Sequence, residues 1–365
     1  MAVTIKDVAR EAQVSIATVS RVVNGHGNVT DETRARILGV AERLRYVPDS
    51  AARSLITGLT HTIGVLLPDM HGEYFSELIR GIDRAARLRG LHLLVSSSHG
   101  DADEATRVLR SMNGRVDGVL IMSPHVDAQL LDRALPTGLP TVLMNTPGDA
   151  GRAPAFLTDN YGGARAMVEH LAAAGYCRIA HITGPDSNYE SGERLRGYRD
   201  ALGQGDSVAE LVFEGNFTEE SGYIAGRRIA AAKPRPDAVF AANDMMAIGC
   251  LFALTEVGLR VPQDVALAGF DDIPIARFVT PPLTTVRAQT TELGRQALEE
   301  LARSIEKPES VRRVHHELKT QLVIRASCAG AASLESSSVA DDGQKNAPRR
   351  AADGKSKVSK QVRKV

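Results

Sequence analysis

The chain is poor in cysteine and carries no net charge. Three of its 365 residues are cysteines, Cys177, Cys250 and Cys328, an odd number without the close spacing of a metal site. Lysine plus arginine and aspartate plus glutamate both total 44, so the formal net charge is zero. We therefore expect buried thiols in a reducing compartment, and any binding to nucleic acid must depend on local rather than overall charge.

Long apolar runs and catalytic signatures are also absent. No apolar stretch is long enough to span a membrane, and the N-terminus lacks the pattern of a secretion signal, so a cytoplasmic protein is expected. The sequence has no glycine-rich phosphate loop, no cluster of histidine and cysteine, and no Gly-x-Ser-x-Gly turn. We therefore expect no catalytic residues, no metal and no cofactor.

The start of the chain predicts two short helices joined by a tight turn. Thr4 is a good helix N-cap, with Asp7 three residues later as in a short capping box. Ser15 caps a second helix immediately after a turn at residues 13–14. The length of 365 residues predicts at least one further domain after these helices.

The second helix has two predicted faces. The residues with the spacing of a core-facing side are Ile16, Val19 and either Val22 or Val23. The residues left on the outer side are Ser15, Ala17, Thr18 and Arg21. Small, polar and cationic side chains on an exposed helix suit the major groove of DNA, although any small helical hairpin has the same spacing.

The sequence of these helices resembles the DNA-binding headpiece of the lac-repressor (LacI/GalR) family of bacterial regulators. The matching segments are residues 3–9, 14–15, 18–24, 29–34 and 46–48. Gln13 departs from the family, which usually has glycine in the turn; a left-handed residue other than glycine costs about 1 kcal/mol. The resemblance implies that these residues contact DNA: Thr4, Lys6, Ser15, Ile16, Ala17, Thr18, Arg21, Asn24, Ala52 and Leu55.

A third helix and a linker follow. Thr30 caps a helix that runs to about Tyr46, and Pro48 ends it, so residues 1–47 are predicted to be an all-α helix-turn-helix domain. Residues 48–60 are a linker with room for one or two helical turns, too few to be stable alone. The resemblance implies that this segment pairs with that of a second subunit on DNA, where Leu55 opens the minor groove. An ordinary apolar linker residue is the alternative for Leu55.

From residue 61 the pattern alternates between strands and helices. Strands are expected at residues 62–68, 91–95, 116–122, 141–144, 178–182, 211–213, 238–241, 265–268 and 317–325. Helices are expected at residues 74–88, 104–112, 162–174, 193–202, 219–232 and 245–257. This order predicts parallel sheets in two lobes, with a ligand cleft between them. The resemblance implies an α/β two-lobed domain like periplasmic sugar-binding proteins over residues 61–328.

The last residues have a different composition. Residues 329–365 contain almost no large apolar side chains and no leucine heptads, and their end is basic. We expect this tail to be disordered. It either attracts DNA weakly or is simply solvated.

Polar residues follow several of the predicted strands. Asp271, Asp272, Asn243 and Asp244 come after strands, as does Asn145. A sugar needs carboxylates and amides for its hydroxyls, an arginine fork and an aromatic face. The resemblance implies effector contacts by these residues: Asn145, Arg194, Phe217, Asn243 and Asp271. Three further candidates are Tyr74, Phe75 and Asp159. Each alone is equally well explained as a helix cap or a core aromatic residue.

These features predict a transcriptional regulator, most simply a repressor of carbohydrate-utilisation genes. It is expected to bind a palindromic operator as a homodimer, associated with the nucleoid, and to respond to a small-molecule effector. Residues 188–190 lack the arginine and threonine of purine-sensing members, so the resemblance favours a sugar. A transport-type solute-binding protein shares the two lobes, but the headpiece argues against it. A sugar-modifying enzyme is the other alternative, since Asp271-Asp272 and Asn243-Asp244 can mimic catalytic carboxylates.

Overall fold

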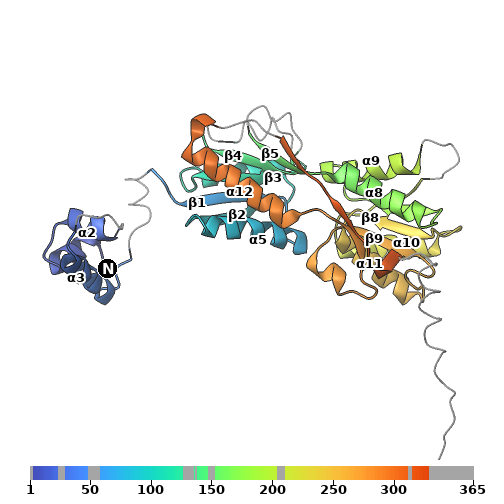
Figure 1. Cartoon of the computed structure of the whole chain (residues 1–365), viewed down its shortest axis with the longest axis horizontal. Helices are drawn as coiled ribbons and strands as arrows, with labels where there is room; N and C mark the ends of the chain where they lie inside the picture. Colours follow the sequence, from blue (N-terminus) through green and yellow to red (C-terminus); the bar gives the residue numbers. More distant parts are fainter. Residues whose placement is uncertain are drawn as a thin grey trace, which may run out of the picture.

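The computed structural model shows a three-helix unit at the N-terminal end and a larger body of two lobes (Figure 1). It describes residues 3–23, 29–47, 58–125, 135, 138–146, 153–203, 210–310 and 315–328. Within these ranges no helix is both long and apolar enough to cross a lipid bilayer. The same ranges hold no group of three or more histidine, cysteine, aspartate or glutamate side chains placed to bind a metal ion.

The N-terminal unit consists of α1 (Ile5–Glu11), α2 (Ile16–Val23) and α3 (Asp31–Arg43). Thr4 and Asp7 form the expected capping box at the start of α1. Gln13 adopts a left-handed conformation, with φ at 53°, as the turn between α1 and α2 requires. The small core is made by one face of each helix: Val8, Ala9, Ala12, Val19, Val22, Ile37 and Val40. The predicted helix-turn-helix arrangement is therefore confirmed.

Ile16 in α2 faces away from the core of the three helices, contrary to expectation. Ile16 was predicted to face the core, but 46% of its surface is exposed. Val22, rather than Val23, is buried beside Val19. Ile16 is the first residue of α2 and lies outside the helical core, so its exposed side chain can contact another molecule.

Lobe 1 is built on a six-stranded parallel sheet with the order β11-β5-β4-β3-β1-β2. Its strands are β1 (Thr62–Leu67), β2 (His92–Ser97), β3 (Gly118–Met122), β4 (Thr141–Met144), β5 (Ala155–Thr158) and β11 (His315–Leu318). The helices α5 (Glu73–Arg87) and α12 (Thr290–Glu306) pack together on one face, and α6 (Ala102–Met112) packs on the other. Strands buried on both faces explain the continuous apolar runs of this region.

Lobe 2 repeats this plan with the order β12-β10-β9-β8-β6-β7. Its strands are β6 (Ile179–Ile182), β7 (Leu211–Phe213), β8 (Ala238–Ala241), β9 (Ala266–Asp271), β10 (Thr284–Arg287) and the antiparallel edge strand β12 (Gln321–Val323). One face is covered by α8 (Asn160–Ala173) and α9 (Tyr189–Leu202), the other by α10 (Glu219–Ala231) and α11 (Asp244–Glu256). The described part of the body also contains the short 3-10 helices η1 (Pro274–Arg277), η2 (Pro308–Ser310) and η3 (Ala326–Cys328).

The chain passes between the lobes three times: from β5 to α8, from β10 to α12 and from β11 to β12. The single strand predicted over residues 317–325 is wrong, because β11 belongs to lobe 1 and β12 to lobe 2 (Figure 1). The sequence reading also missed β5, β10 and α12. The packing of α12 on α5 is close enough that a Cβ atom on Gly81 would lie 2.1 Å from the Thr291 carbonyl oxygen.

The three cysteines are free thiols. Cys250 and Cys328 are buried, as expected. Cys177 is exposed, contrary to expectation, because it lies in the turn between α8 and β6.

Candidate functional site

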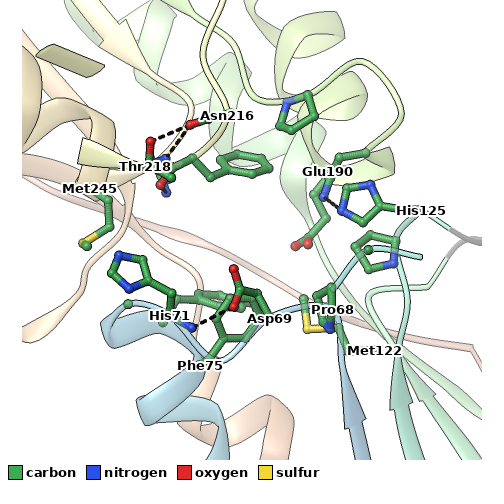
Figure 2. A pocket seen from close by; sticks show the side chains of 18 of the residues that line it. Pro68, Asp69, His71, Phe75, Met122, His125, Glu190, Asn216, Thr218 and Met245 are labelled. Carbon is green, nitrogen blue, oxygen red and sulfur yellow. Dashed lines mark hydrogen bonds between the residues drawn. The ribbon is translucent and has the colours of Figure 1, made fainter. Parts of the chain in front are cut away.

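A cavity of about 230 Å³ lies between the two lobes (Figure 2). Its walls come from the carboxyl ends of strands and the first turns of helices in both lobes. Lobe 1 contributes Pro68, Asp69, His71, Gly72, Tyr74, Phe75, His99, Gly100, Met122, Pro124 and His125. Lobe 2 contributes Pro185, Asn188, Glu190, Arg194, Asn216, Phe217, Thr218, Asn243, Met245 and Asp271. This is the part of an open α/β sheet where ligands usually bind.

Arg194 lines this cavity and is buried, with 3% of the residue exposed. Its Nε donates to Oδ1 of Asn160 at 2.8 Å, and Nη1 donates to the Ala242 carbonyl oxygen at 2.5 Å. The guanidinium carbon lies 3.9 Å from the centre of the Phe270 ring, a cation–π arrangement. Arg194 is in the second turn of α9, because this helix begins at Tyr189 rather than at the expected residue 193.

Two buried carboxylates share the remaining nitrogen of Arg194. Nη2 lies 3.3 Å from Oδ1 of Asp271 and 3.6 Å from Oε1 of Glu190. Burial raises the pKa of Asp271 to about 7; Arg194 opposes this rise and Glu190 adds to it. Burial also raises the pKa of Glu190. Apart from its ion pair, Asp271 Oδ1 has no hydrogen-bond partner among the described residues, so it is available to a ligand hydroxyl.

Asn145 connects the two lobes behind the cavity wall. Its Nδ2 donates to the Tyr74 hydroxyl at 3.0 Å and to Oε1 of Glu190 at 2.8 Å, and its Oδ1 accepts from the Thr158 backbone at 2.8 Å. Asn145 is 1% exposed and is not among the lining residues. The structure therefore places it behind Tyr74 and Glu190 rather than at the cavity surface.

Phe217 and Asn243 lie on the lobe 2 side. Asn243 caps α11 by accepting from the Met246 backbone at 2.9 Å, and its Nδ2 donates to the Phe217 carbonyl oxygen at 2.9 Å. The Phe217 ring lies against Gly184, where a Cβ atom would be 2.3 Å from the ring. Phe217 and Phe75 thus bring aromatic surface to the cavity from opposite lobes.

Three of these residues have a left-handed backbone, which is unusual for residues other than glycine. The φ angles are 42° at Asn145, 71° at Phe217 and 109° at Asp271. Such conformations persist only where the surroundings impose them, and they concentrate at functional sites.

The other acidic candidates have structural partners. Asp159 caps α8 by accepting from the Gly162 backbone at 2.8 Å, forms an ion pair with Lys319 at 3.1 Å, and is not a lining residue. Asp244 is fully buried and accepts from the Thr285 hydroxyl and the Ile273 backbone. Asp272 accepts from Arg287 and Arg325. Asp244 and Asp272 are thus engaged in lobe 2, and neither lines the cavity.

The sequence reading missed several lining residues, of which Glu190 matters most. Figure 2 shows its carboxylate directed into the cavity, with Asp69 and His71 on the opposite side. Glu190 lies four residues before Arg194, a spacing that brings side chains together on a helix. The helix predicted from the sequence begins at residue 193, so Glu190 lies outside it and the four-residue spacing to Arg194 does not appear.

The outer face of α2 is available to a partner. Ser15, Ile16, Ala17 and Arg21 are exposed, and Thr18 is half-buried. Ser15 caps α2 by accepting from the Thr18 backbone at 3.1 Å. Lys6 in α1 and Thr4, the N-cap of α1, are also exposed. Three predicted DNA contacts lie outside the described residues: Asn24, Ala52 and Leu55.

Comparison with known proteins gives matches over both parts of the chain. Residues 4–49 match the model described as bacterial regulatory proteins, lacI family, and residues 168–328 match a periplasmic binding protein-like domain. The ribose operon repressor of Escherichia coli (strain K12) is 37% identical over 310 residues, 84% of this chain and 94% of that protein.

Other relatives extend this result. The HTH-type transcriptional repressor PurR of Aliivibrio salmonicida (strain LFI1238) is 32% identical over 328 residues, 89% of this chain and 98% of that protein. A crystal structure of the lac repressor dimer bound to operator and the anti-inducer ONPF superposes with a TM-score of 0.80 at 28% identity. The superposition covers 90% of this chain and 99% of that one.

Proposed function

The chain belongs to the LacI family of bacterial regulatory proteins and is a DNA-binding transcriptional regulator, and we propose that it represses genes of carbohydrate utilisation in response to a sugar or sugar derivative. It binds palindromic operator DNA as a homodimer, associated with the nucleoid while bound. The relative from Escherichia coli is a ribose operon repressor, and the similar lac repressor structure is that of a dimer bound to operator.

The cavity between the lobes is the observation that carries the sugar assignment. It combines an arginine and carboxylates with aromatic surface from both lobes. Carboxylate oxygens accept from paired hydroxyl groups, and an aromatic ring packs against the apolar face of a sugar ring. The proposed effector contacts are Tyr74, Phe75, Arg194, Phe217, Asn243 and Asp271, and we add Glu190 because it also lines the cavity. In this proposal Asn145 and Asp159 position other groups.

The exposed face of α2 supports the DNA-binding proposal. Arg21 presents a guanidinium suited to the acceptors of guanine, and Ile16 and Ala17 offer apolar surface to a thymine methyl group. In the linker, Leu55 is proposed to enter the minor groove at the centre of the operator.

Exposed apolar side chains on both lobes support the homodimer. Phe252 on α11 and Ile224 on α10 are 64% and 52% exposed, and the Phe252 ring lies 5.9 Å from that of Tyr223. On lobe 1, Met70 and Leu94 are 53% and 38% exposed. Large apolar side chains that lie together at the surface, as those of Phe252 and Tyr223 do, are typical of protein interfaces.

Direct bonds between the lobes suggest how an effector controls DNA binding. Asn145 of lobe 1 donates to Glu190 of lobe 2, and the Ile275 backbone of lobe 2 donates to Glu73 of lobe 1 at 2.8 Å. A ligand in the cavity shifts the lobe arrangement by binding one arrangement more tightly. In a homodimer this changes the spacing of the two linkers, and only the closer spacing allows both to fold as helices on DNA.

A thermal-shift screen of a sugar library on the full chain, followed by operator binding with each hit, tests the proposal. We expect at least one sugar to stabilise the protein and change its operator affinity. A sugar that is turned over during incubation would instead favour the enzyme alternative, and a purine that acts where no sugar does would contradict the assignment.

A further inference from the structure

The charges around the cavity indicate which class of sugar it accepts. Resting on the proposed function, we infer that the effector is an uncharged polyhydroxylated molecule, and that Glu190 and Asp271 exclude phosphorylated and carboxylated sugars. No relative's name and no family match assigns this role to Glu190.

The first observation is that the arginine is already occupied. Nε and Nη1 of Arg194 donate to Asn160 and the Ala242 carbonyl oxygen, and Nη2 faces both Asp271 and Glu190. An entering phosphate or carboxylate therefore finds no free guanidinium edge for the paired hydrogen bonds that anion recognition uses.

The second observation is the balance of charge. Among the described lining residues, Arg194 is the sole lysine or arginine, whereas Asp69, Glu190 and Asp271 are acidic. The three lining histidines, His71, His99 and His125, do not reverse this balance. His71 and His99 are exposed, so water screens any charge on them, and His71 lies 3.6 Å from Glu219. Burial lowers the pKa of His125.

The third observation is the burial of the two carboxylates. Glu190 is 6% exposed and Asp271 is 8% exposed, so water screens them poorly from a ligand charge. At pH 8, above the pKa of about 7 that burial gives Asp271, ionised carboxylates at this site repel a ligand anion. The hydroxyl groups of a neutral sugar instead donate to them, including to Oδ1 of Asp271, which has an ion pair with Arg194 at 3.3 Å but no hydrogen-bond partner among the described residues. The expected discrimination against an anionic analogue is about 100-fold or more.

Matched pairs of ligands test the inference by isothermal titration at pH 8: ribose against ribose 5-phosphate, glucose against glucose 6-phosphate, and galactose against galacturonate. The wild type is expected to bind a neutral member at least about 100-fold more tightly than its anionic partner. Glu190→Gln keeps the shape and removes one charge, so this ratio is expected to fall at least about tenfold. Asp186→Asn is the matched control, since Asp186 is exposed and is not a lining residue.

The possible results separate the two proposals. Tighter binding of a phosphorylated or carboxylated sugar than of its neutral partner would overturn the inference while leaving sugar control intact. A folded Glu190→Gln protein with an unchanged ratio would overturn the role of Glu190. If no sugar of either kind binds, the proposed function fails and the inference fails with it. The wild-type ratio decides the charge class even if Glu190→Gln does not fold.

Discussion

Arg194 contacts groups from four separate segments of the chain, three side chains and one backbone carbonyl, and its burial determines the properties of its neighbours. The guanidinium contacts Glu190 on its own helix, Asn160 at the start of α8, the backbone after β8 and Asp271 at the end of β9. Because all of these groups are removed from water, the two carboxylates compete for one cation, and one of them retains an acceptor for a ligand.

A pH dependence of stability follows from Asp271. Its pKa is about 7 in the folded chain, against an ordinary value of 3.8, because of burial. The folded state therefore binds this proton more tightly than the unfolded state, and the free energy of unfolding falls as pH rises from about 4 to about 7. The expected loss is on the order of 1–4 kcal/mol.

Chemical denaturation of the wild type and Asp271→Asn at pH 5 and pH 8 measures this effect. The variant, which cannot ionise at this position, should lose less stability between the two pH values. Asp186→Asn is the control and should follow the wild type. If the wild type and Asp271→Asn lose the same free energy of unfolding between pH 5 and pH 8, the raised pKa of Asp271 is contradicted.

In the DNA-binding helices, Arg21 is expected to hydrogen-bond to a base of the operator. Arg21→Ala should lose about 1–3 kcal/mol of binding to the operator and much less on random DNA. Arg43→Ala removes the same charge from α3, where Arg43 pairs with Glu11, and serves as the control in a fluorescence-anisotropy titration. Equal losses on operator and random DNA would show that Arg21 contacts only phosphates.

Some residues of the cavity could be predicted from the sequence and others could not. Asn243 and Asp271 follow separate predicted strands, and the family resemblance added Arg194 and Phe217; all four line the cavity. Glu190 was missed because the predicted helix began at residue 193, so the four-residue spacing between Glu190 and Arg194 fell outside it.

At the scale of helices and strands, local patterns predicted most elements but not the ones that cross between lobes. β4, β7 and β8 have the predicted bounds. By contrast, α12 follows a strand of lobe 2 but buries Leu293, Ala297 and Leu301 in lobe 1. β11 and β12 lie three residues apart in different sheets. Periodicity identifies an apolar face but not the lobe against which that face packs.

The loop after β6 packs against the ring of Phe217, an aromatic residue that lines the cavity. Gly184→Ala places a Cβ atom where the Phe217 ring now lies, so the ring must move. Effector affinity is expected to fall at least about tenfold, a loss of about 1.4 kcal/mol. Isothermal titration with the sugar found in the screen measures this loss.

Gly192→Ala is the control for this substitution. Gly192 lies in α9 with nothing within 4 Å of an added Cβ atom, so the change should preserve effector affinity. It should also raise stability by up to about 1 kcal/mol, because alanine favours a helix. Unchanged affinity in Gly184→Ala would show that the Phe217 ring does not contact the effector.

The linker is tested by its effect on DNA shape. Leu55→Ala should weaken operator binding and reduce DNA bending, because a smaller side chain cannot hold a base step open. Effector affinity should not change, since residue 55 precedes both lobes. A circular-permutation gel assay measures the bend, and an unaltered bend would remove the proposed role of Leu55.

At the scale of the whole molecule, the DNA-binding helices α1–α3 and the cavity between the lobes belong to separate parts of the chain, before residue 48 and after residue 57. Communication between them therefore depends on a change in the arrangement of the lobes. Bonds between the lobes, among them those from Asn145 to Glu190 and from Ile275 to Glu73, are contacts whose geometry such a change must alter. Coupling between two sites by such a rearrangement is typically worth about 1–3 kcal/mol.

The most direct test measures operator affinity with and without the effector for the wild type and for Asp271→Ala, with dimerisation checked by sedimentation. The wild-type affinity should change about 5- to 150-fold on effector binding. The variant should dimerise and bind the operator as ligand-free wild type does, with no response to the effector. If the effector is required for DNA binding, the variant should instead fail to bind. A variant that responds to the effector with unchanged affinity would contradict the placement of the effector at Asp271.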